Sequence, residues 1–79
     1  MTVIRGMKRY SGWSTDNGRI FVENPEGKII MDGWMRRTGA VEIYSRIDDD
    51  SYVGQLNPMG NGLIMSPKTG ETIRIEVQR

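Results

Sequence analysis

Turn-forming residues recur along the whole chain and divide it into short segments. Ten glycines and three prolines are spread over the 79 residues, so that a turn signal arrives roughly every eight to twelve positions. No segment carries apolar residues at the i, i+3, i+4, i+7 spacing of an amphipathic helix over three turns. This pattern is typical of an antiparallel meander, in which short strands follow one another through tight turns.

The stretch from 40 to 56 is the clearest strand–turn–strand unit. Val41 and Ile43 alternate with Glu42 and Tyr44, which is the period of two expected of a strand with one buried face. An acidic turn at 48–51 interrupts this alternation, and an extended, β-prone run follows it. The sequence therefore predicts a hairpin here.

Comparable segments predict the rest of the sheet. We expect strands at 2–10, 19–24, 28–37, 63–66 and 71–78. Residues 1–79 then form a single all-β domain, a small antiparallel meander of six or seven strands that is barrel-like or a strongly coiled sheet. We find no internal repeat. A closed barrel is favoured because closure removes the exposed strand edges of a flat meander.

Three turns have distinctive chemistry. Asn17-Gly18 is a strong signal for a type I′ hairpin turn, in which both central residues have positive φ. Pro25-Glu26-Gly27 favours a G1-bulge loop, with the glycine in the left-handed region. Gly33 lies inside a strand, where it indicates a bulge or a sharp bend.

The composition argues against an enzyme. The chain has no cysteine and no histidine, which removes disulfides, thiolate ligands, the commonest general base and the commonest transition-metal ligand. No glycine-rich phosphate loop opens a helix, because no helix is expected. We therefore predict a non-enzymatic protein with no cofactor and no metal site.

Two further features bear on the cellular setting. The N-terminal ten residues contain no apolar region of the kind found in secretory signals. The longest apolar runs are far shorter than the roughly 20 residues that a membrane-spanning helix needs. We expect a cytoplasmic protein that does not associate with membranes.

The charge is nearly balanced overall but unevenly distributed. Eleven basic residues face ten acidic residues, for a net charge of +1. The part up to Arg46 is basic, and the part after it is acidic. Aromatic residues lie among the basic ones of the first part, and we take six of these as the candidate partner-binding residues: Tyr10, Trp13, Trp34, Arg36, Arg37 and Tyr44.

Aromatic and arginine side chains in this combination suit two kinds of partner. Trp, Tyr and Arg are enriched at hot spots of protein interfaces, and they also stack on bases and contact phosphates in β-sheet nucleic-acid binders. Tyr10, Trp34 and Tyr44 share even-numbered positions with polar neighbours in the expected strands, so we expect them on the outer face.

The acidic turn is the one concentrated run of like charge. Asp48, Asp49 and Asp50 lack the glycine and glutamate spacing of an EF-hand loop. We interpret them as a solvated hairpin tip that is available as a second contact for a basic partner.

These observations favour a small binding module that acts through protein–protein contact. A small chain without catalytic groups suits an inhibitor, an adaptor or an assembly subunit. Accessory proteins of phages and mobile elements are one such class. The first alternative is a nucleic-acid-binding barrel that uses the same face. The second is a structural homo-oligomer, because so short a chain buries only about 60–65% of its unfolded surface and gains stability by association.

Overall fold

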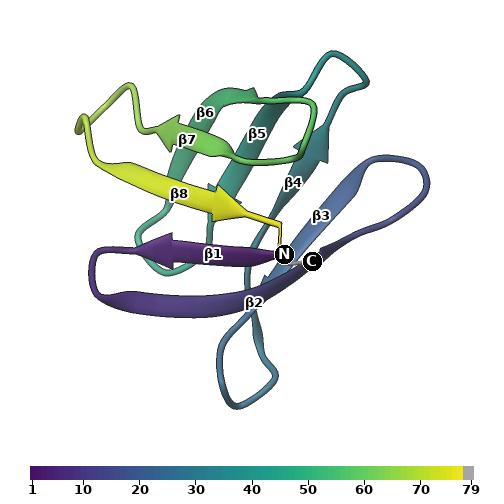
Figure 1. Ribbon diagram of the computed structural model, residues 1–79. Coiled ribbons are helices and arrows are strands. Elements are labelled where there is room, and N and C mark those ends of the chain that lie inside the picture. Colours follow the sequence, from purple (N-terminus) through teal and green to yellow (C-terminus); the bar gives the residue numbers. More distant parts are fainter. Residues whose placement is uncertain (78–79) are drawn as a thin grey trace.

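The protein is a closed barrel of eight antiparallel strands, seen in a computed structural model that describes residues 1–77 (Figure 1). Strands are the only regular elements in this range. Their bounds are β1 Thr2–Arg5, β2 Lys8–Ser14, β3 Arg19–Glu23, β4 Ile29–Met35, β5 Ala40–Ser45, β6 Asp50–Leu56, β7 Gly62–Met65 and β8 Thr72–Glu76.

Each strand pairs with its neighbours in the sequence, and β8 closes the barrel by pairing with β1. The prediction of an all-β, barrel-like meander is confirmed. The predicted strand number is wrong, because the segment 2–10 is two strands. Gly6 and Met7 form a two-residue turn between them, with Gly6 at φ 61°.

Apolar side chains at alternate positions of the strands point inward and fill the interior of the barrel. Tyr52 is the largest of these side chains and is fully buried. The buried apolar set is Val3, Ile20, Val22, Ile30, Met31, Val41, Ile43, Tyr52, Leu56, Ile64, Ile73 and Ile75. Polar and aromatic residues at the intervening positions consequently point outward.

Inward-facing glycines allow neighbouring strands to approach closely. A Cβ atom at Gly33 would overlap with the carbonyl oxygen of Glu42, and one at Gly54 would overlap with the carbonyl oxygen of Leu63. The bulge in this part of the sheet lies between Val22 and Glu23 instead. Gly33 is therefore a site of close packing between β4 and β5, and the expectation of a bulge there is wrong.

A 21-residue repeat underlies the barrel, contrary to our expectation from the sequence. Twenty-one positions separate Gly12 from Gly33 and Gly33 from Gly54. Each of these glycines faces the same position of its own hairpin, namely Val22, Ile43 and Ile64 respectively. The hairpins β2–β3, β4–β5 and β6–β7 are thus three copies of one unit.

The loops of the three hairpins share the same backbone hydrogen bond. Gly18, Gly39 and Gly60, again 21 positions apart, each donate an N–H to the carbonyl of the residue three positions earlier. Gly18 is at φ 86°, whereas Asn17 does not have positive φ. The type I′ turn predicted at Asn17-Gly18 is therefore wrong, because the loop is a longer turn that ends in a left-handed glycine. The G1-bulge loop predicted at 25–27 agrees with the structure, since Gly27 is at φ 83°.

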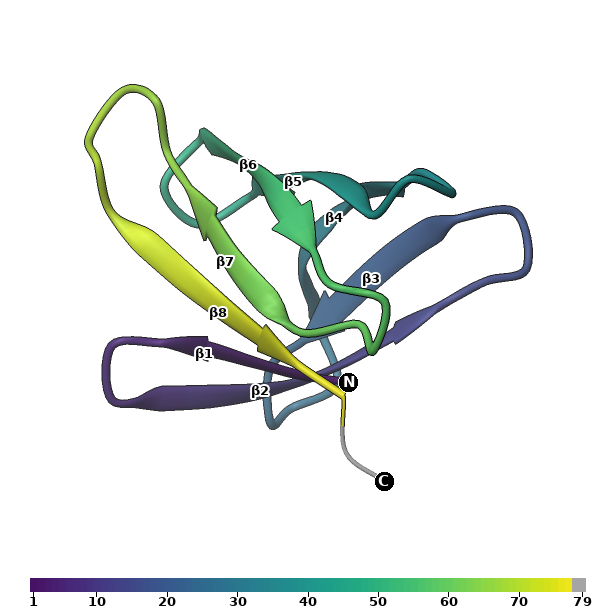
Figure 2. The ribbon, with the colours of Figure 1, turned by 45° about the horizontal axis from the view of Figure 1, so that its top comes forward.

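The pair β8–β1 completes the barrel as a fourth unit. Ile75 faces Val3 in the register that Gly33 and Ile43 have in β4–β5. The place of the fourth hairpin loop is held by the N-terminus and the end of β8. These ends and the three glycine loops 15–18, 36–39 and 57–60 all lie at one end of the barrel, which we call the loop end (Figures 1 and 2).

Candidate protein-binding surface

Three aromatic rings and one guanidinium form a continuous row on the outer face of β2, β3 and β4. Trp13 and Phe21 face each other across β2 and β3, and their rings stack with centroids 5.7 Å apart. The guanidinium of Arg19 lies 5.1 Å from the Phe21 ring and 4.4 Å from the Trp34 ring. We call these four residues, Trp13, Phe21, Arg19 and Trp34, the aromatic ridge.

The tryptophans of the ridge are strongly exposed. Trp13 is 41% exposed and Trp34 is 52% exposed. They occupy equivalent positions of the first two units, and the third and fourth units carry Gln55 and Glu76 there. Since the same backbone accepts glutamine and glutamate at this position, the fold itself does not require a tryptophan.

Carboxylates are interspersed with the cations of this face. Asp32 pairs with Arg19 at 3.5 Å and with Arg46 at 3.2 Å. Glu42 lies beside Trp34 on the neighbouring strand, and it takes part in none of the ion pairs found among residues 1–77. Two of the arginines on this face therefore share one carboxylate within the chain.

Tyr44 extends the aromatic surface onto β5, as predicted. It lies opposite Asp32 and is 41% exposed. Its hydroxyl donates a hydrogen bond to Asp49 in the turn that follows. This bond to a carboxylate raises the pKa of the Tyr44 hydroxyl above its usual value.

Tyr10 does not belong to the ridge. It faces Val3 across β1 and β2, on the inner side of the barrel, and it packs against the core. The predicted outer-face position of Tyr10 is wrong, because the turn at Gly6 starts a new strand and the outer positions of β2 are those of Arg9, Ser11 and Trp13.

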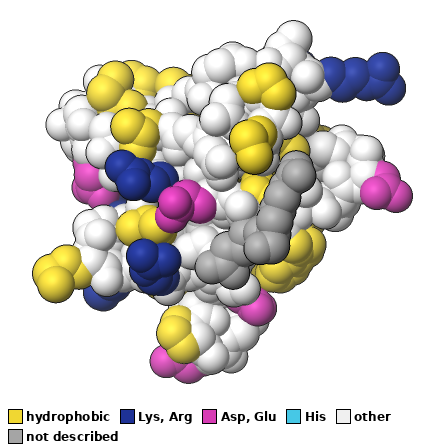
Figure 3. Space-filling model, viewed as in Figure 1, with side chains coloured by type: hydrophobic (Ala, Val, Ile, Leu, Met, Phe, Trp, Pro, Cys, Tyr) yellow, Lys and Arg dark blue, Asp and Glu magenta, His cyan; other side chains and the backbone are white. Residues whose placement is uncertain are grey.

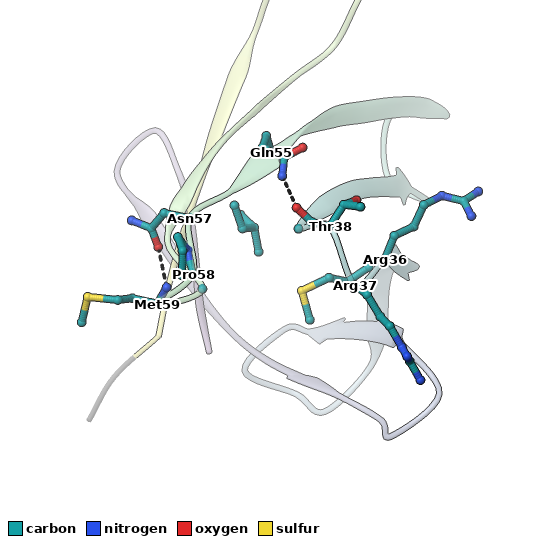
Figure 4. Close-up of a pocket in the computed structure, with 11 residues that line it drawn as sticks. Arg36, Arg37, Thr38, Gln55, Asn57, Pro58 and Met59 are labelled. Atoms are coloured by element: carbon teal, nitrogen blue, oxygen red, sulfur yellow. Dashed lines mark hydrogen bonds between the residues drawn. The ribbon is translucent and has the colours of Figure 1, made fainter.

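Arg36 and Arg37 lie in the loop between β4 and β5, at the loop end. Neither takes part in an ion pair among residues 1–77. An open hollow of about 540 Å³ separates this loop from Pro58 and Met59 of the β6–β7 loop, and the two arginine side chains point away from these residues (Figure 4). The space-filling view shows a Lys or Arg side chain that projects into solvent at the upper right of the molecule (Figure 3).

The hollow between these loops has a mainly apolar wall. Met35 and Leu56 line it from the ends of β4 and β6, and Met59, 57% exposed, lines it from the β6–β7 loop. Gln55 bridges the loops by donating a hydrogen bond to the carbonyl of Thr38. The loop end therefore offers unpaired arginines beside apolar side chains.

Asp48 is engaged inside the chain. Arg5 donates to both of its oxygens, at 2.8 and 3.2 Å, and also binds Glu71 of the β7–β8 turn. The buried Tyr52 hydroxyl donates to Asp48 at 3.0 Å. The hydrogen bonds from Arg5 hold the pKa of Asp48 at about 2, and burial, followed by the bond to Asp48, raises the pKa of Tyr52 to about 12.

The other two acidic residues of this turn also have partners. Asp50 accepts a hydrogen bond of 2.6 Å from the buried hydroxyl of Ser66, and Asp49 accepts the one from Tyr44. The three carboxylates therefore point to three different partners and do not form one free acidic surface. Among the described residues, no group of three or more acidic side chains is placed to hold a metal ion.

Two ridge residues were missed in the sequence. Phe21 and Arg19 alternate with the core residues Ile20 and Val22, which is the signal that places them outside. Their role depends on the register that sets Phe21 against Trp13 and Arg19 against Trp34. The alternation of buried and exposed residues within one strand does not determine its register with the neighbouring strands.

Comparisons of the chain with family models, with curated proteins and with solved structures give no match. Within residues 1–77, no helix is long and apolar enough to cross a membrane. The assignment of a function therefore rests on the surface described above.

Proposed function

We propose that the protein is a non-enzymatic binding module that contacts a protein partner through the aromatic ridge, with Arg36 and Arg37 at its border. The exposure of Trp13 and Trp34 carries this proposal. Exposed indoles are costly in a surface that has no partner, and Trp and Arg dominate the energetics of protein interfaces. Inhibitors, adaptors and assembly subunits use small scaffolds in this way.

The charges around the ridge favour a protein over a nucleic acid. A phosphate backbone lying along the ridge would meet the carboxylates of Asp32 and Glu42, and the arginine next to it, Arg19, is already paired with Asp32. Nucleic-acid binders instead line the path of the backbone with free cations.

A nucleic-acid partner is the second candidate, and one observation favours it. Arg36 and Arg37 are adjacent, are exposed and have no carboxylate partner among the described residues. Under this alternative the loop end would bind phosphates and the exposed Trp34 would stack on a base.

Capture of partners from the producing cell, with and without nuclease, distinguishes the two candidates. We expect a protein that stays bound after nuclease treatment and is lost with Trp34→Ala. Glu76→Ala, at the equivalent position of the fourth unit, is the matched control and should retain the partner. If nuclease releases everything that is bound, or Trp34→Ala captures as well as the parent chain, the proposal is wrong.

A further inference from the structure

A second, smaller hollow of about 270 Å³ lies beside Trp34 on the outer face of the barrel. Trp34 of β4 and Val53 of β6 line it from two sides, and Ala40 lines it from β5 between them. Two charged residues also line it, Glu42 and Arg36. The hollow thus combines an aromatic wall, a small residue and an unpaired carboxylate.

The repeat shows what occupies the corresponding place in the first unit. Ala40 is 21 positions after Arg19. The side chain of Arg19 covers the outer face there, because its guanidinium stacks on Phe21 and Trp34 and pairs with Asp32. Alanine at the equivalent position removes this cover and leaves the hollow open.

Trp34 is therefore covered on one side only. Arg19 lies on its β3 side, 4.4 Å from the ring centroid, and the hollow lies on its β5 side. Glu42 faces Trp34 across β4 and β5, and it makes no ion pair among residues 1–77. The surface next to Trp34 thus presents an aromatic ring and a carboxylate, and Arg36, which also lines the hollow, makes no ion pair with that carboxylate.

We propose that this hollow binds an arginine side chain of the protein partner, with its guanidinium against Trp34 and paired with Glu42. This inference rests on the proposed function, because it names what the partner presents to the ridge. A planar guanidinium is favoured over a lysine ammonium, since it stacks on an indole and binds a carboxylate with two hydrogen bonds at once.

Arg36 makes an anion the competing occupant. Arg36 lines the same hollow, and its positive charge would attract a carboxylate from the partner. An arginine ligand and an anionic ligand predict opposite changes in affinity when Glu42 or Arg36 is replaced. An arginine ligand should bind more weakly without Glu42 and more strongly without Arg36, whereas an anionic ligand should show the reverse.

The direct test is a titration with N-acetyl-arginine amide at low ionic strength, followed through the indole N–H signals in ¹⁵N NMR spectra. Trp13→Phe assigns the remaining signal to Trp34. We expect saturable binding with a dissociation constant on the order of 10 mM, with the shift confined to Trp34. N-acetyl-lysine amide should bind several-fold more weakly, and N-acetyl-glutamate amide should not shift the signal.

Three variants and one control variant make the test specific. Glu42→Gln should weaken binding of the arginine amide by about fivefold, the size of an exposed ion pair, and Arg36→Gln should strengthen it. Ala40→Arg, which restores the long side chain that the first unit has at this position, should fill the hollow and abolish binding. Glu26→Gln, a charge-matched change in the β3–β4 turn, is the control and should leave binding unchanged.

The outcomes separate this inference from the proposed function. Absence of any Trp34 shift with the arginine amide, preference for the glutamate amide, or equal binding by Glu42→Gln would each overturn the arginine site. If a captured protein partner is lost with Trp34→Ala but bound equally by Glu42→Gln and Ala40→Arg, the proposed function stands and the inference fails.

Discussion

Arg5 shows how single residues hold this small barrel together. Its guanidinium joins β1 to Asp48 in the turn after β5 and to Glu71 in the turn before β8. The guanidinium also lies 5.6 Å from the ring of the buried Tyr52, whose hydroxyl binds the same carboxylate. Because the chain has no cysteine, disulfides cannot connect these turns, and the Arg5 network links them instead.

Acid should weaken this network in a defined pH window. The pKa of Asp48 in the folded chain is about 2, below its ordinary value of 3.8. The stabilisation is therefore fully present above about pH 4 and is lost as the pH falls through about 2. Because solvent screens this partly exposed ion pair, we expect it to contribute on the order of 1 kcal/mol to the free energy of unfolding. Urea unfolding at pH 5, 3 and 2, followed by circular dichroism, measures it.

Two variants check the assignment of this pH dependence to Asp48. Asp48→Asn should be less stable than the parent chain at pH 5 and should lose most of the change between pH 4 and pH 2. Asp16→Asn, in the exposed β2–β3 loop, should behave like the parent chain. An unchanged acid profile in Asp48→Asn would show that another carboxylate is responsible.

At the level of strands and turns, the sequence predicts those elements whose alternation is uninterrupted. The hairpin of β5 and β6 and the last strand, β8, appear where they were expected. The boundary between β1 and β2 was missed because Gly6 and Met7 turn the chain without any proline, asparagine or aspartate. That error moved Tyr10 to the wrong face, although Trp34 and Tyr44 are exposed on the outer face as expected.

The repeat could not be recognised from alternation alone. Its units share two glycines and a pattern of apolar positions, while the exposed positions differ, as with Trp34 and Gln55. The inward glycines acquire their meaning only from the register that brings a carbonyl of the next strand against them. Close packing between strands is a three-dimensional property that one strand does not encode.

Equivalent glycines should therefore respond unequally to alanine. A Cβ at Gly33 would overlap with the backbone of β5, whereas one at Gly12 would lie 3.1 Å from the flexible side chain of Met1 and from the Phe21 carbonyl oxygen. We expect Gly33→Ala to lower the free energy of unfolding by about 3 kcal/mol and Gly12→Ala by about 1 kcal/mol. Urea denaturation followed by circular dichroism compares them, and equal losses would contradict the proposed packing.

The whole molecule is a ring of four similar hairpins, one of which is interrupted. β8 and β1 form the fourth hairpin, with the register of the other three. Closure leaves no free strand edge, which protects a small sheet protein from edge-to-edge association. It also leaves the outer face available for the partner contact that we propose.

A circular permutant tests this architecture. In the first unit, a loop of five residues separates Ser14 from Ile20. In the fourth unit, Val77 is equivalent to Ser14 and Met1 is equivalent to Ile20. A loop of the same length between Val77 and Met1 needs five residues. Gln78 and Arg79 are two of them, and an added linker, Asn-Gly-Thr, provides the other three. A chain joined in this way and opened between Pro58 and Met59 should fold to the same barrel, because exposed loop tips tolerate new termini.

The linker length provides the control for the permutant. Direct fusion of Arg79 to Met1, with the same opening in the β6–β7 loop, should give a clearly lower melting temperature by circular dichroism. If the linker makes no difference, the fourth unit does not follow the 21-residue period.

The proposed function depends most directly on what holds the partner to the ridge. The decisive measurement is the dissociation constant of the captured partner between 50 and 500 mM salt, for the parent chain, for Trp34→Ala and for Arg36→Glu/Arg37→Glu. A protein interface anchored by Trp34 predicts less than tenfold weakening by salt and at least about 30-fold weakening by Trp34→Ala. Steep weakening with salt, together with full loss in the arginine variant and no effect of Trp34→Ala, would contradict the account.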